Sequence, residues 1–327
     1  MLTGKTVVLG VTGSIAAYKI ANLASMLIKQ HCDVHVIMTK NATNFINPIA
    51  FETLTKNKCM VDTFDRNFQF NIAHVSLAQK ADLMMIAPAS ANIIAKLAHG
   101  LADDMLSTTA LACKCPILVS PAMNSNMYVN PIVQENIQIL NKYGFTVIIP
   151  DVGVLACEDV GIGKMPDEHV LMDHIMREIA FEKDLKGERI LITAGPTHEA
   201  IDPVRIITNH STGKMGYALA RMAMLRGADV TLVTGPVSLT PPPFTTTVQI
   251  QSAQDMYEAV VGLFEEQDIV IKAAAEAEYR TNNIRDEKIK KRDGEKTIQL
   301  EMTKDILAGL GSMKRPDQCL CGFSMET

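Results

Sequence analysis

The stretch VVLGVTGSIAAYK, residues 7–19, joins an apolar run to a segment with helical periodicity. Its first residues are mostly β-branched and suit a buried strand, whereas apolar residues recur at helical spacing from Ile15 onward. Gly10, Gly13 and Ala16 give the turn between them a GxxGxxA spacing. This stretch therefore predicts a strand that passes through a glycine-bearing turn into a helix, the first step of an α/β fold.

The turn itself suits an anion. Backbone N–H groups at the start of a helix lack intrahelical partners and carry the positive end of the helix dipole, so a phosphate binds well there. Ser14 stands where its hydroxyl can cap the helix. The spacing departs from the GxGxxG dinucleotide fingerprint, however, and glycines that only shape a tight turn remain an equal alternative on these residues alone.

Length and charge narrow the class of protein. At 327 residues the chain is long enough for two domains, and its net charge of −5 gives no reason to expect a nucleic-acid partner. No window contains eighteen uninterrupted apolar residues, and the first residues do not form a secretory signal. We expect a cytoplasmic protein that binds neither membranes nor nucleic acid.

Strands and helices alternate through the chain, and the alternation restarts once. Strands are expected in the first half at 5–11, 33–38, 82–87, 116–120 and 145–149, and in the second half from 187 and near 229–233, 247–251, 268–272, 297–302 and 318–323. The fold class predicted is α/β, with two tandem doubly wound, mostly parallel-sheet, Rossmann-like domains. The expected boundaries are residues 1–181, a charged linker at 182–187, and residues 188–327.

The cysteines predict reduced thiols, because their number is odd and their spacing forms no disulfide framework. Cys113 with Cys115, and Cys319 with Cys321, are each interpreted as small buried residues, with a metal site as the weaker alternative. Cys157 lies in LACEDVGIGKM, a stretch typical of an exposed loop, and this setting favours a chemical role.

Polar residues follow several of the expected strands. Asn124, in PAMNSNM, follows the strand that ends at Ser120, where open α/β sheets bind ligands, although a helix-capping role is the alternative. Ser90, in APASANIIAK, has the same relation to the preceding strand. His74, in AHVSL, is a lone histidine on an amphipathic segment, and such residues are more often structural than catalytic.

Together these motifs resemble those of one family. GSIAAYK, AHVSL, APASANIIAKLAHGLADDML, PAMNSNM and the stretch around Cys157 occur in the order found in flavin-dependent cysteine decarboxylases. ITAGPTHEAIDPVRIITNHSTGKMG, AAAEAEYR, KIKK and GFSMET are similar to the phosphopantothenate–cysteine ligase domain. The chain thus resembles, over nearly its whole length, the bifunctional phosphopantothenoylcysteine decarboxylase/phosphopantothenate–cysteine ligase family of coenzyme A biosynthesis.

For the first half, the resemblance implies that the turn at Gly13 and Ser14 holds the phosphate of FMN, with Thr39 and Ser90 flanking the cofactor. It implies that FMN oxidises the cysteine moiety of 4′-phosphopantothenoylcysteine before carbon dioxide leaves, and that 4′-phosphopantetheine is the product.

The same resemblance gives roles to three further residues: His74 as an acid or base, Asn124 as the holder of the departing carboxylate, and Cys157 as a proton donor. Glu158 replaces the family's glycine after that cysteine, and Lys164 its arginine, so the flexibility of this loop is in doubt.

For the second half, the resemblance implies that CTP, with Mg²⁺, activates 4′-phosphopantothenate as an acyl-cytidylate that the amine of cysteine then attacks. Asn209 and Arg205 match positions that handle this intermediate. The remaining substrate- or nucleotide-binding matches are Ala275, Glu278, Lys288 and Phe323. Glu276 replaces an apolar residue of the family pattern and Glu278 an aspartate, and an added carboxylate should oppose triphosphate binding unless it faces solvent.

Two alternatives stay open at this point: a decarboxylase with an inactive ligase domain, and a non-catalytic flavin-binding regulatory subunit. Retention of His74 and Cys157 argues against the second. The family continues beyond GFSMET, so the ligase domain is expected to be incomplete at its carboxyl end and ligation to be weak or absent. The resemblance further implies a homo-oligomer, trimer-based and potentially a dodecamer, formed through the decarboxylase domain.

Overall fold

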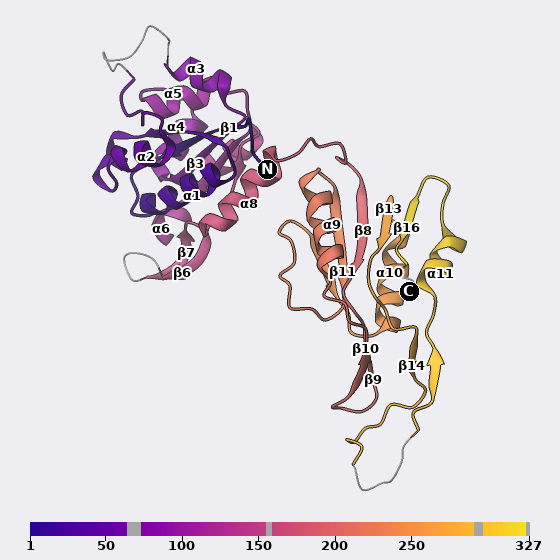
Figure 1. The fold of residues 1–327 in the computed structure, drawn as a ribbon. Coiled ribbons are helices and arrows are strands. Elements are labelled where there is room, and N and C mark those ends of the chain that lie inside the picture. Colours follow the sequence, from indigo (N-terminus) through magenta and orange to yellow (C-terminus); the bar gives the residue numbers. More distant parts are fainter. Residues whose placement is uncertain (64–72, 155–158, 291–296, 325–327) are drawn as a thin grey trace. The chain divides into compact units, whose positions relative to one another are not determined.

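The computed structural model describes residues 1–63, 73–154, 159–290 and 297–324 (Figure 1). The chain divides into two compact units, Met1–Ala180 and Phe181–Thr327. Each unit is built on a parallel sheet whose strands alternate with helices along the chain. The predicted class of two tandem α/β domains is confirmed.

The first unit has its main sheet in the order β2-β1-β3-β4-β5, with every pairing parallel. Its strands are β1 (Thr6–Val11), β2 (Asp33–Met38), β3 (Leu83–Ala89), β4 (Ile117–Pro121), β5 (Thr146–Val147), β6 (Asp151–Val154) and β7 (Val160–Lys164). Its helices are α1 (Ala17–Lys29), η1 (Lys40–Asn44), α2 (Pro48–Thr55), α3 (Ala73–Lys80), α4 (Ala91–Ala98), α5 (Met105–Ala112), α6 (Ser125–Tyr128), α7 (Pro131–Lys142) and α8 (Glu168–Ile179).

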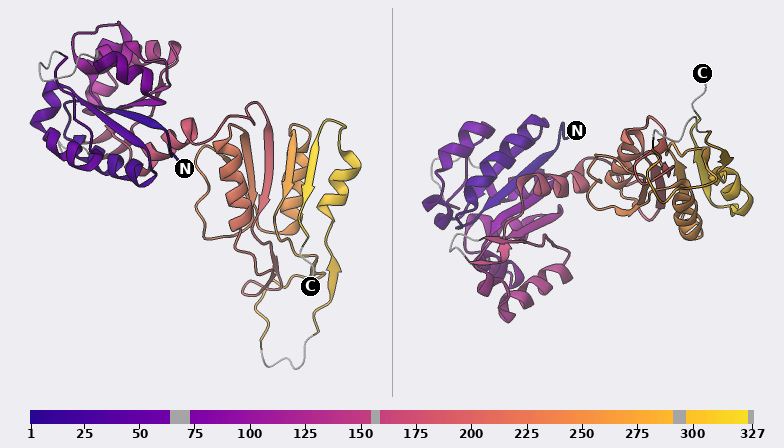
Figure 2. Two further views of the ribbon diagram at one scale, coloured as in Figure 1. Left: turned by 45° about the horizontal axis from the view of Figure 1, so that its top comes forward. Right: turned by 90° about the horizontal axis from the view of Figure 1, so that it is seen from below.

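Burial explains why the opening stretch folds as it does. Every residue of β1 is buried, as the apolar run predicts for a central strand of a parallel sheet. On α1, Ile20, Leu23, Ala24 and Leu27 are buried at helical spacing. Helices α1, α2 and α8 pack together, while α4 contacts both α5 and α7, so helices cover both sides of the sheet (Figure 2).

The helix after the turn begins later than expected and is capped differently. Helix α1 starts at Ala17 with Ala16 as its N-cap residue, and no side chain caps it. The Ser14 hydroxyl only accepts a long bond, 3.4 Å, from the N–H of Ala16. The predicted capping role of Ser14 is therefore wrong, because the chain makes an additional turn, closed by the Ser14 carbonyl, before the helix starts.

The second unit has its sheet in the order β12-β11-β8-β13-β16, again with every pairing parallel. Its strands are β8 (Arg189–Ala194), β9 (His198–Ala200), β10 (Ile206–Thr208), β11 (Asp229–Thr234), β12 (Thr246–Gln249), β13 (Ile269–Lys272), β14 (Tyr279–Thr281), β15 (Leu300–Met302) and β16 (Cys319–Gly322). Its helices are α9 (Lys214–Leu225), α10 (Ala253–Phe264) and α11 (Ile306–Met313).

Two short antiparallel pairs lie outside this sheet. Strands β9 and β10 form a hairpin, and β14 pairs with β15; β9 and β14 are in contact and project together beyond one end of the sheet (Figure 1). The strand expected at 297–302 is observed only at Leu300–Met302. Its side chains are exposed, and it pairs with β14 instead of joining the parallel sheet. Cys319 and Cys321 are exposed as well, since β16 is an edge strand, so the prediction that they are buried is wrong.

The charged segment 182–187 is hydrogen-bonded to the second unit. The N–H of Leu185 donates to the carbonyl of Arg226 at 3.1 Å, and Lys183 Nζ donates to the carbonyl of Leu225 at 2.6 Å. Asp184 pairs with the guanidinium of Arg226. The segment thus belongs with the end of α9.

No helix within the described ranges combines the length and the apolar character needed to cross a membrane.

Candidate functional sites

The first candidate site lies at the carboxyl edge of the first sheet, where the turn after β1 meets the ends of β2 and β3. The N–H of Thr39, directly after β2, donates to the carbonyl of Val11 at 2.9 Å. Thr12 is buried; its hydroxyl donates to the carbonyl of Pro88 at 2.6 Å and accepts from the N–H of Ser90 at 2.9 Å. These bonds hold Gly13, Thr39 and Ser90 at one edge.

Two observations at this edge fit a bound group. A Cβ atom at Gly13 would stand 2.9 Å from the Cβ of Asn41, so the turn has room for glycine only. The hydroxyl oxygen of Thr39 is buried and finds no hydrogen-bond partner in the part of the chain that the structure describes. Unpaired buried hydroxyls are rare in proteins, and a ligand oxygen or nitrogen would satisfy this one.

Ser90 and Asn124 both cap helices. Ser90 is the N-cap residue of α4, and its hydroxyl accepts a long bond, 3.5 Å, from the N–H of Ile93. Asn124 follows β4 and caps α6, with its Oδ1 accepting from the N–H of Asn126 at 2.9 Å. The capping alternative for Asn124 is thus part of the structure, and it fixes the side chain at the carboxyl edge of the sheet.

His74 lies in the first turn of α3 and is half-buried. Helix α3 leads into β3 through Asp82, whose carboxylate accepts from the N–H of Thr6 at the start of β1, so this end of α3 lies at the amino edge of the sheet. The opposite end, with His74, consequently points toward the carboxyl edge. Cys157 and Glu158 lie outside the described residues.

The hairpin of β6 and β7 packs against the segment that contains Asn124. The N–H of Met123 donates to the carbonyl of Gly163 at 3.1 Å. A Cβ atom at Gly161 would stand 2.2 Å from Ser125 Oγ, so the hairpin and the segment with Asn124 are in direct contact. Sequence reasoning missed Thr12 and Ser125, because their contacts join segments that are far apart along the chain.

The second candidate site lies at the carboxyl edge of the second sheet. Gly195 follows β8 and Gly213 precedes α9; both have φ near +75°, and a Cβ at Gly213 would stand 3.4 Å from the Cα of Gly195. Gly213 is the N-cap residue of α9, and no side chain caps this helix. The arrangement predicts an anion site at the start of α9.

Asn209 and Ala275 are brought together at this edge. Asn209 Nδ2 donates to the carbonyl of Ala275 at 3.1 Å and to that of Glu276 at 2.9 Å. The N–H of Ala275 donates to the carbonyl of Gly195 at 2.9 Å. Phe323 is exposed and directly follows β16. It lies beside the end of β13, since its N–H donates to the carbonyl of Lys272, the last residue of that strand, at 3.3 Å.

Arg205 and Lys288 are brought together through Asp202. The Arg205 guanidinium pairs with Asp202 and also donates to the carbonyl of Ile289 at 3.3 Å. The N–H of Ile289 donates to Asp202 Oδ2 at 3.1 Å, which holds the exposed Lys288 nearby. Burial acts to raise the pKa of Asp202, but N–H donors from Ile289, Val204 and Arg205 outweigh it and lower this pKa to about 2.

The two unexpected carboxylates differ in environment. Glu278 is exposed, and its carbonyl accepts from the N–H of Thr303 at 2.9 Å. Glu276 does not face solvent as a free charge: it pairs with Lys272, the last residue of β13. The repulsion of a triphosphate that the sequence suggested is therefore reduced at Glu276 by a lysine partner.

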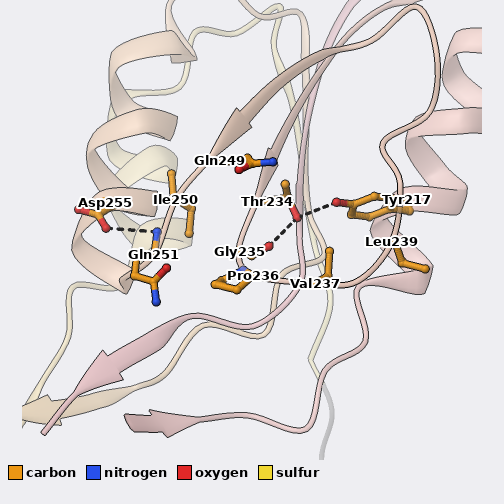
Figure 3. Close-up of a pocket in the computed structure, with 10 residues that line it drawn as sticks. All are labelled: Tyr217, Thr234, Gly235, Pro236, Val237, Leu239, Gln249, Ile250, Gln251 and Asp255. Atoms are coloured by element: carbon orange, nitrogen blue, oxygen red, sulfur yellow. Dashed lines mark hydrogen bonds between the residues drawn. The ribbon is translucent and has the colours of Figure 1, made fainter. Parts of the chain in front are cut away.

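A pocket of about 440 Å³ adjoins this site, at the ends of β11 and β12 (Figure 3). Tyr217 and Thr234 line it, and their hydroxyls are 3.3 Å apart. Val237 forms part of the wall and also contacts the turns at Gly195 and Gly213. None of the residues predicted from the sequence lines this pocket.

Comparison with known proteins gives a matching family model for each half of the chain. Residues 1–180 match the family model described as Flavoprotein, and residues 185–327 match that of the DNA/pantothenate metabolism flavoprotein C-terminal domain. A solved structure of a PPC decarboxylase mutant complexed with pantothenoylaminoethenethiol is 27% identical, with a TM-score of 0.47, and covers 52% of this chain and 96% of that one.

Curated relatives match along the entire chain. The coenzyme A biosynthesis bifunctional protein CoaBC of Bacillus subtilis (strain 168) is 46% identical over 330 residues, which cover 100% of this chain and 81% of the relative. The protein of the same name from Escherichia coli (strain K12) is 42% identical over 329 residues, with 100% and 81% covered. The chain therefore belongs to the family of CoaBC bifunctional coenzyme A biosynthesis proteins.

Proposed function

We propose that this chain carries out two consecutive steps of coenzyme A biosynthesis. The second unit joins 4′-phosphopantothenate to cysteine at the expense of CTP, and the first unit decarboxylates the resulting 4′-phosphopantothenoylcysteine to 4′-phosphopantetheine. The observation that carries the proposal is the similarity to CoaBC proteins along the entire chain, together with two separate sites, each at the carboxyl edge of its own sheet.

In the first unit, the turn at Gly13 and Ser14 would hold the phosphate of FMN, with Thr39 and Ser90 beside the cofactor. The buried Thr39 hydroxyl supports this assignment, because it needs a partner that the described residues do not supply. When bound, FMN supplies a reversible two-electron oxidation of the substrate's cysteine moiety.

The chain's own residues would then bind the substrate and move protons. Asn124 would hold the substrate carboxylate until it leaves as carbon dioxide, and His74 would exchange a proton as an acid or base. Cys157 would donate the last proton to the product. These roles rest on the family motifs, and the cap at Asn124 supports them by fixing the direction of that side chain.

In the second unit, the carboxylate of 4′-phosphopantothenate would attack the α-phosphate of CTP and release pyrophosphate. The cysteine amine would then attack the acyl carbon, CMP would leave, and an amide would form. Asn209 and Arg205 would contact the intermediate, with Ala275, Glu278, Lys288 and Phe323 around the nucleotide. The open N–H groups at the start of α9 support a phosphate site.

Mg²⁺ would arrive with the triphosphate. Within the described ranges, the side chains of His, Cys, Asp and Glu form no group of three that could hold a metal. Phosphate oxygens are good ligands for Mg²⁺, which usually keeps several waters and few protein ligands. The ion would thus neutralise the phosphates beside Lys288 without a dedicated protein cage.

The test is an assay with 4′-phosphopantothenate, cysteine, CTP and Mg²⁺, with both amide products resolved by mass spectrometry. Because residues that match the ligase motifs come together at one sheet edge, we expect ligation to proceed, in contrast to the weak or absent ligation expected from the sequence alone. 4′-Phosphopantothenoylcysteine should form and then be converted to 4′-phosphopantetheine. Leaving out CTP should abolish both products, whereas 4′-phosphopantothenoylcysteine supplied directly should be decarboxylated without CTP. A lack of decarboxylation of the supplied intermediate by the FMN-loaded protein would contradict the function proposed for the first unit.

A further inference from the structure

A partly buried ion pair lies beside Asn209 in the second unit. Lys272 ends β13, and its Nζ contacts Oε1 of Glu276, four residues later. The Lys272 side chain is 18% exposed and that of Glu276 is 11% exposed. By contrast, the Arg280–Glu301 pair of the same unit leaves its side chains 43% and 45% exposed. The Lys272–Glu276 pair is therefore much less exposed to water than the Arg280–Glu301 pair.

The main chain between these two residues is tied down at several points. The N–H of Ala274 donates to Thr193 Oγ1 at 3.1 Å, and the N–H of Ala277 donates to Thr197 Oγ1 at 2.9 Å. Together with the bond from Ala275 to Gly195, these bonds fix residues 274–277 on the turn that follows β8. The carbonyl groups that hold Asn209 belong to this same segment. Glu276 thus holds Asn209 through its main chain and Lys272 through its side chain.

Loss of either partner should lower the stability of this region, because the other charge would be left uncompensated. Removing a charge from water costs several kcal/mol, and its buried partner offsets that cost only while it is present. Glu276 Oε2 is buried and has no hydrogen-bond partner among the described residues, so Lys272 is its main compensation. An apolar residue at position 276, as the family pattern has, would leave the partly buried lysine without this partner. Replacing both partners of such a pair by apolar residues is often neutral for stability, whereas removing one partner is strongly destabilising.

We propose that Lys272 and Glu276 are positioning residues of the ligase reaction, which act by fixing the carbonyl groups that hold Asn209. The inference rests on the ligase activity proposed above. Neither side chain is required to touch a substrate, because the effect passes through the main chain of residues 274–277 to the amide of Asn209.

The test compares K272M, E276V and the double variant K272M/E276V. We expect each single variant to lower kcat for ligation by about 10- to 100-fold with a much smaller change in KM for CTP, since a shifted Asn209 affects the reacting intermediate most. The double variant removes both charges and should recover to within about threefold of the wild type, a strongly non-additive result. Decarboxylation by the same molecules should stay unchanged, because it takes place in the first unit; a thermal unfolding curve like that of the wild type is the check that the second unit remains folded.

R226M and D184N are the matched controls, because they break an exposed pair of the same unit that lies outside the ligase motifs. They should leave ligation unchanged. Single variants that ligate like the wild type, or a double variant as slow as either single one, would overturn the proposal.

A crystal structure of E276V supplies a readout that does not depend on activity. Asn209 Nδ2 should no longer be within hydrogen-bond distance of both carbonyls at 275 and 276, and an unmoved Asn209 would overturn the proposal. If the wild-type chain does not ligate at all, the function proposed for this unit is wrong. The crystal structure of E276V would still show whether the Lys272–Glu276 pair positions Asn209.

Discussion

Gly13 shows how one missing side chain shapes the first site. The chain turns here directly after β1, and the neighbouring Asn41 leaves too little room for a methyl group. Thr39, two residues before Asn41, is bonded through its N–H to Val11 at the end of β1. A side chain added at Gly13 would therefore displace Asn41 and, with it, the nearby hydroxyl of Thr39, which flanks the proposed flavin site.

We expect Gly13→Ala to lose most of its FMN, because the added methyl group must push Asn41 and η1 away from the turn. The measurement is flavin absorbance per chain after gel filtration. Gly262→Ala is the matched control, since a Cβ at Gly262, in α10, meets no atom within 4 Å. Full flavin occupancy in Gly13→Ala would show that the turn is not the phosphate site.

Cys157→Ser tests the proposed proton donor. A serine hydroxyl is a far weaker acid than a thiol, so the variant should oxidise and decarboxylate the substrate but fail to protonate the product. We expect an oxidised product two hydrogens lighter than 4′-phosphopantetheine to accumulate in the mass spectrum. His74→Asn should instead stop the reaction before carbon dioxide is released. Normal 4′-phosphopantetheine formation by Cys157→Ser would refute the role of the thiol.

At the scale of elements, the carboxylate of Asp202 helps to tie the loop at 282–290 to the β9–β10 hairpin, together with the N–H of Arg285, which donates to the carbonyl of Ile201 at 3.1 Å. Asp202 accepts from the N–H groups of Val204, Arg205 and Ile289 and pairs with the Arg205 guanidinium. It is itself almost fully buried. This residue thus positions Lys288 relative to Arg205; it belongs to the motif that carries Arg205 but not to the KIKK motif that carries Lys288.

Asp202→Asn should weaken this tie. The pKa of Asp202 is lowered from 3.8 to about 2 in the folded protein, so its ionised form stabilises the fold fully above about pH 4 and this contribution is lost as the pH falls toward 2. We expect a lower free energy of unfolding for the variant between pH 5 and pH 8, with the difference from the wild type narrowing below about pH 4.

Urea unfolding at each pH measures this difference, and KM for CTP should rise in parallel because Lys288 is less well placed. Asp286→Asn, an exposed change in the same loop, is the control. A difference between Asp202→Asn and the wild type that does not change with pH would show that the charge of Asp202 is not what holds the loop.

Sequence patterns predicted the elements that bury a face and missed those that do not. Strands β1 and β8 are apolar runs inside a sheet, so their position follows from composition. The β6–β7 pair and β14 are short and largely exposed, and no strand was expected for them. A strand was expected at 297–302, but its pairing with β14 was not. Their pairing depends on contacts with distant segments, such as Gly161 on Ser125.

The same limit applies to the sites. Gly13 and Asn124 could be proposed from the sequence because strand ends and glycine turns are visible in it, and the family motifs added Thr39, Arg205 and Asn209 to the proposed sites. Lys272 gave no signal, since it ends a strand that is otherwise apolar. Its partner Glu276 was noticed only as a departure from the motif. The sign of its effect could not be predicted without knowing that a lysine neutralises it.

At the scale of the whole molecule, the first unit exposes apolar side chains beside its proposed flavin site. Ile15 and Tyr18 are 57% and 58% exposed, and they lie next to the turn at Gly13. Phe45, directly after η1, is exposed on the neighbouring segment. Clustered apolar residues at the rim of a ligand site are typical of a protein–protein interface.

We therefore propose that copies of the chain associate through this surface, with the flavin near the contact, in keeping with the trimer-based assembly that the family motifs imply. Ile15→Glu introduces a charge into the surface, and the free energy needed to remove that charge from water opposes association. We expect the variant to be smaller than the wild type by light scattering during gel filtration. It should also lose flavin, because the rim of the site is no longer covered.

Met313→Glu serves as the control, since it places the same charge at an exposed apolar position on α11 of the other unit. It should leave both mass and flavin content unchanged. An Ile15→Glu variant that keeps the wild-type mass would contradict association through this surface. One that dissociates but retains its flavin would instead show that each copy holds FMN by itself, and that the apolar rim serves assembly alone.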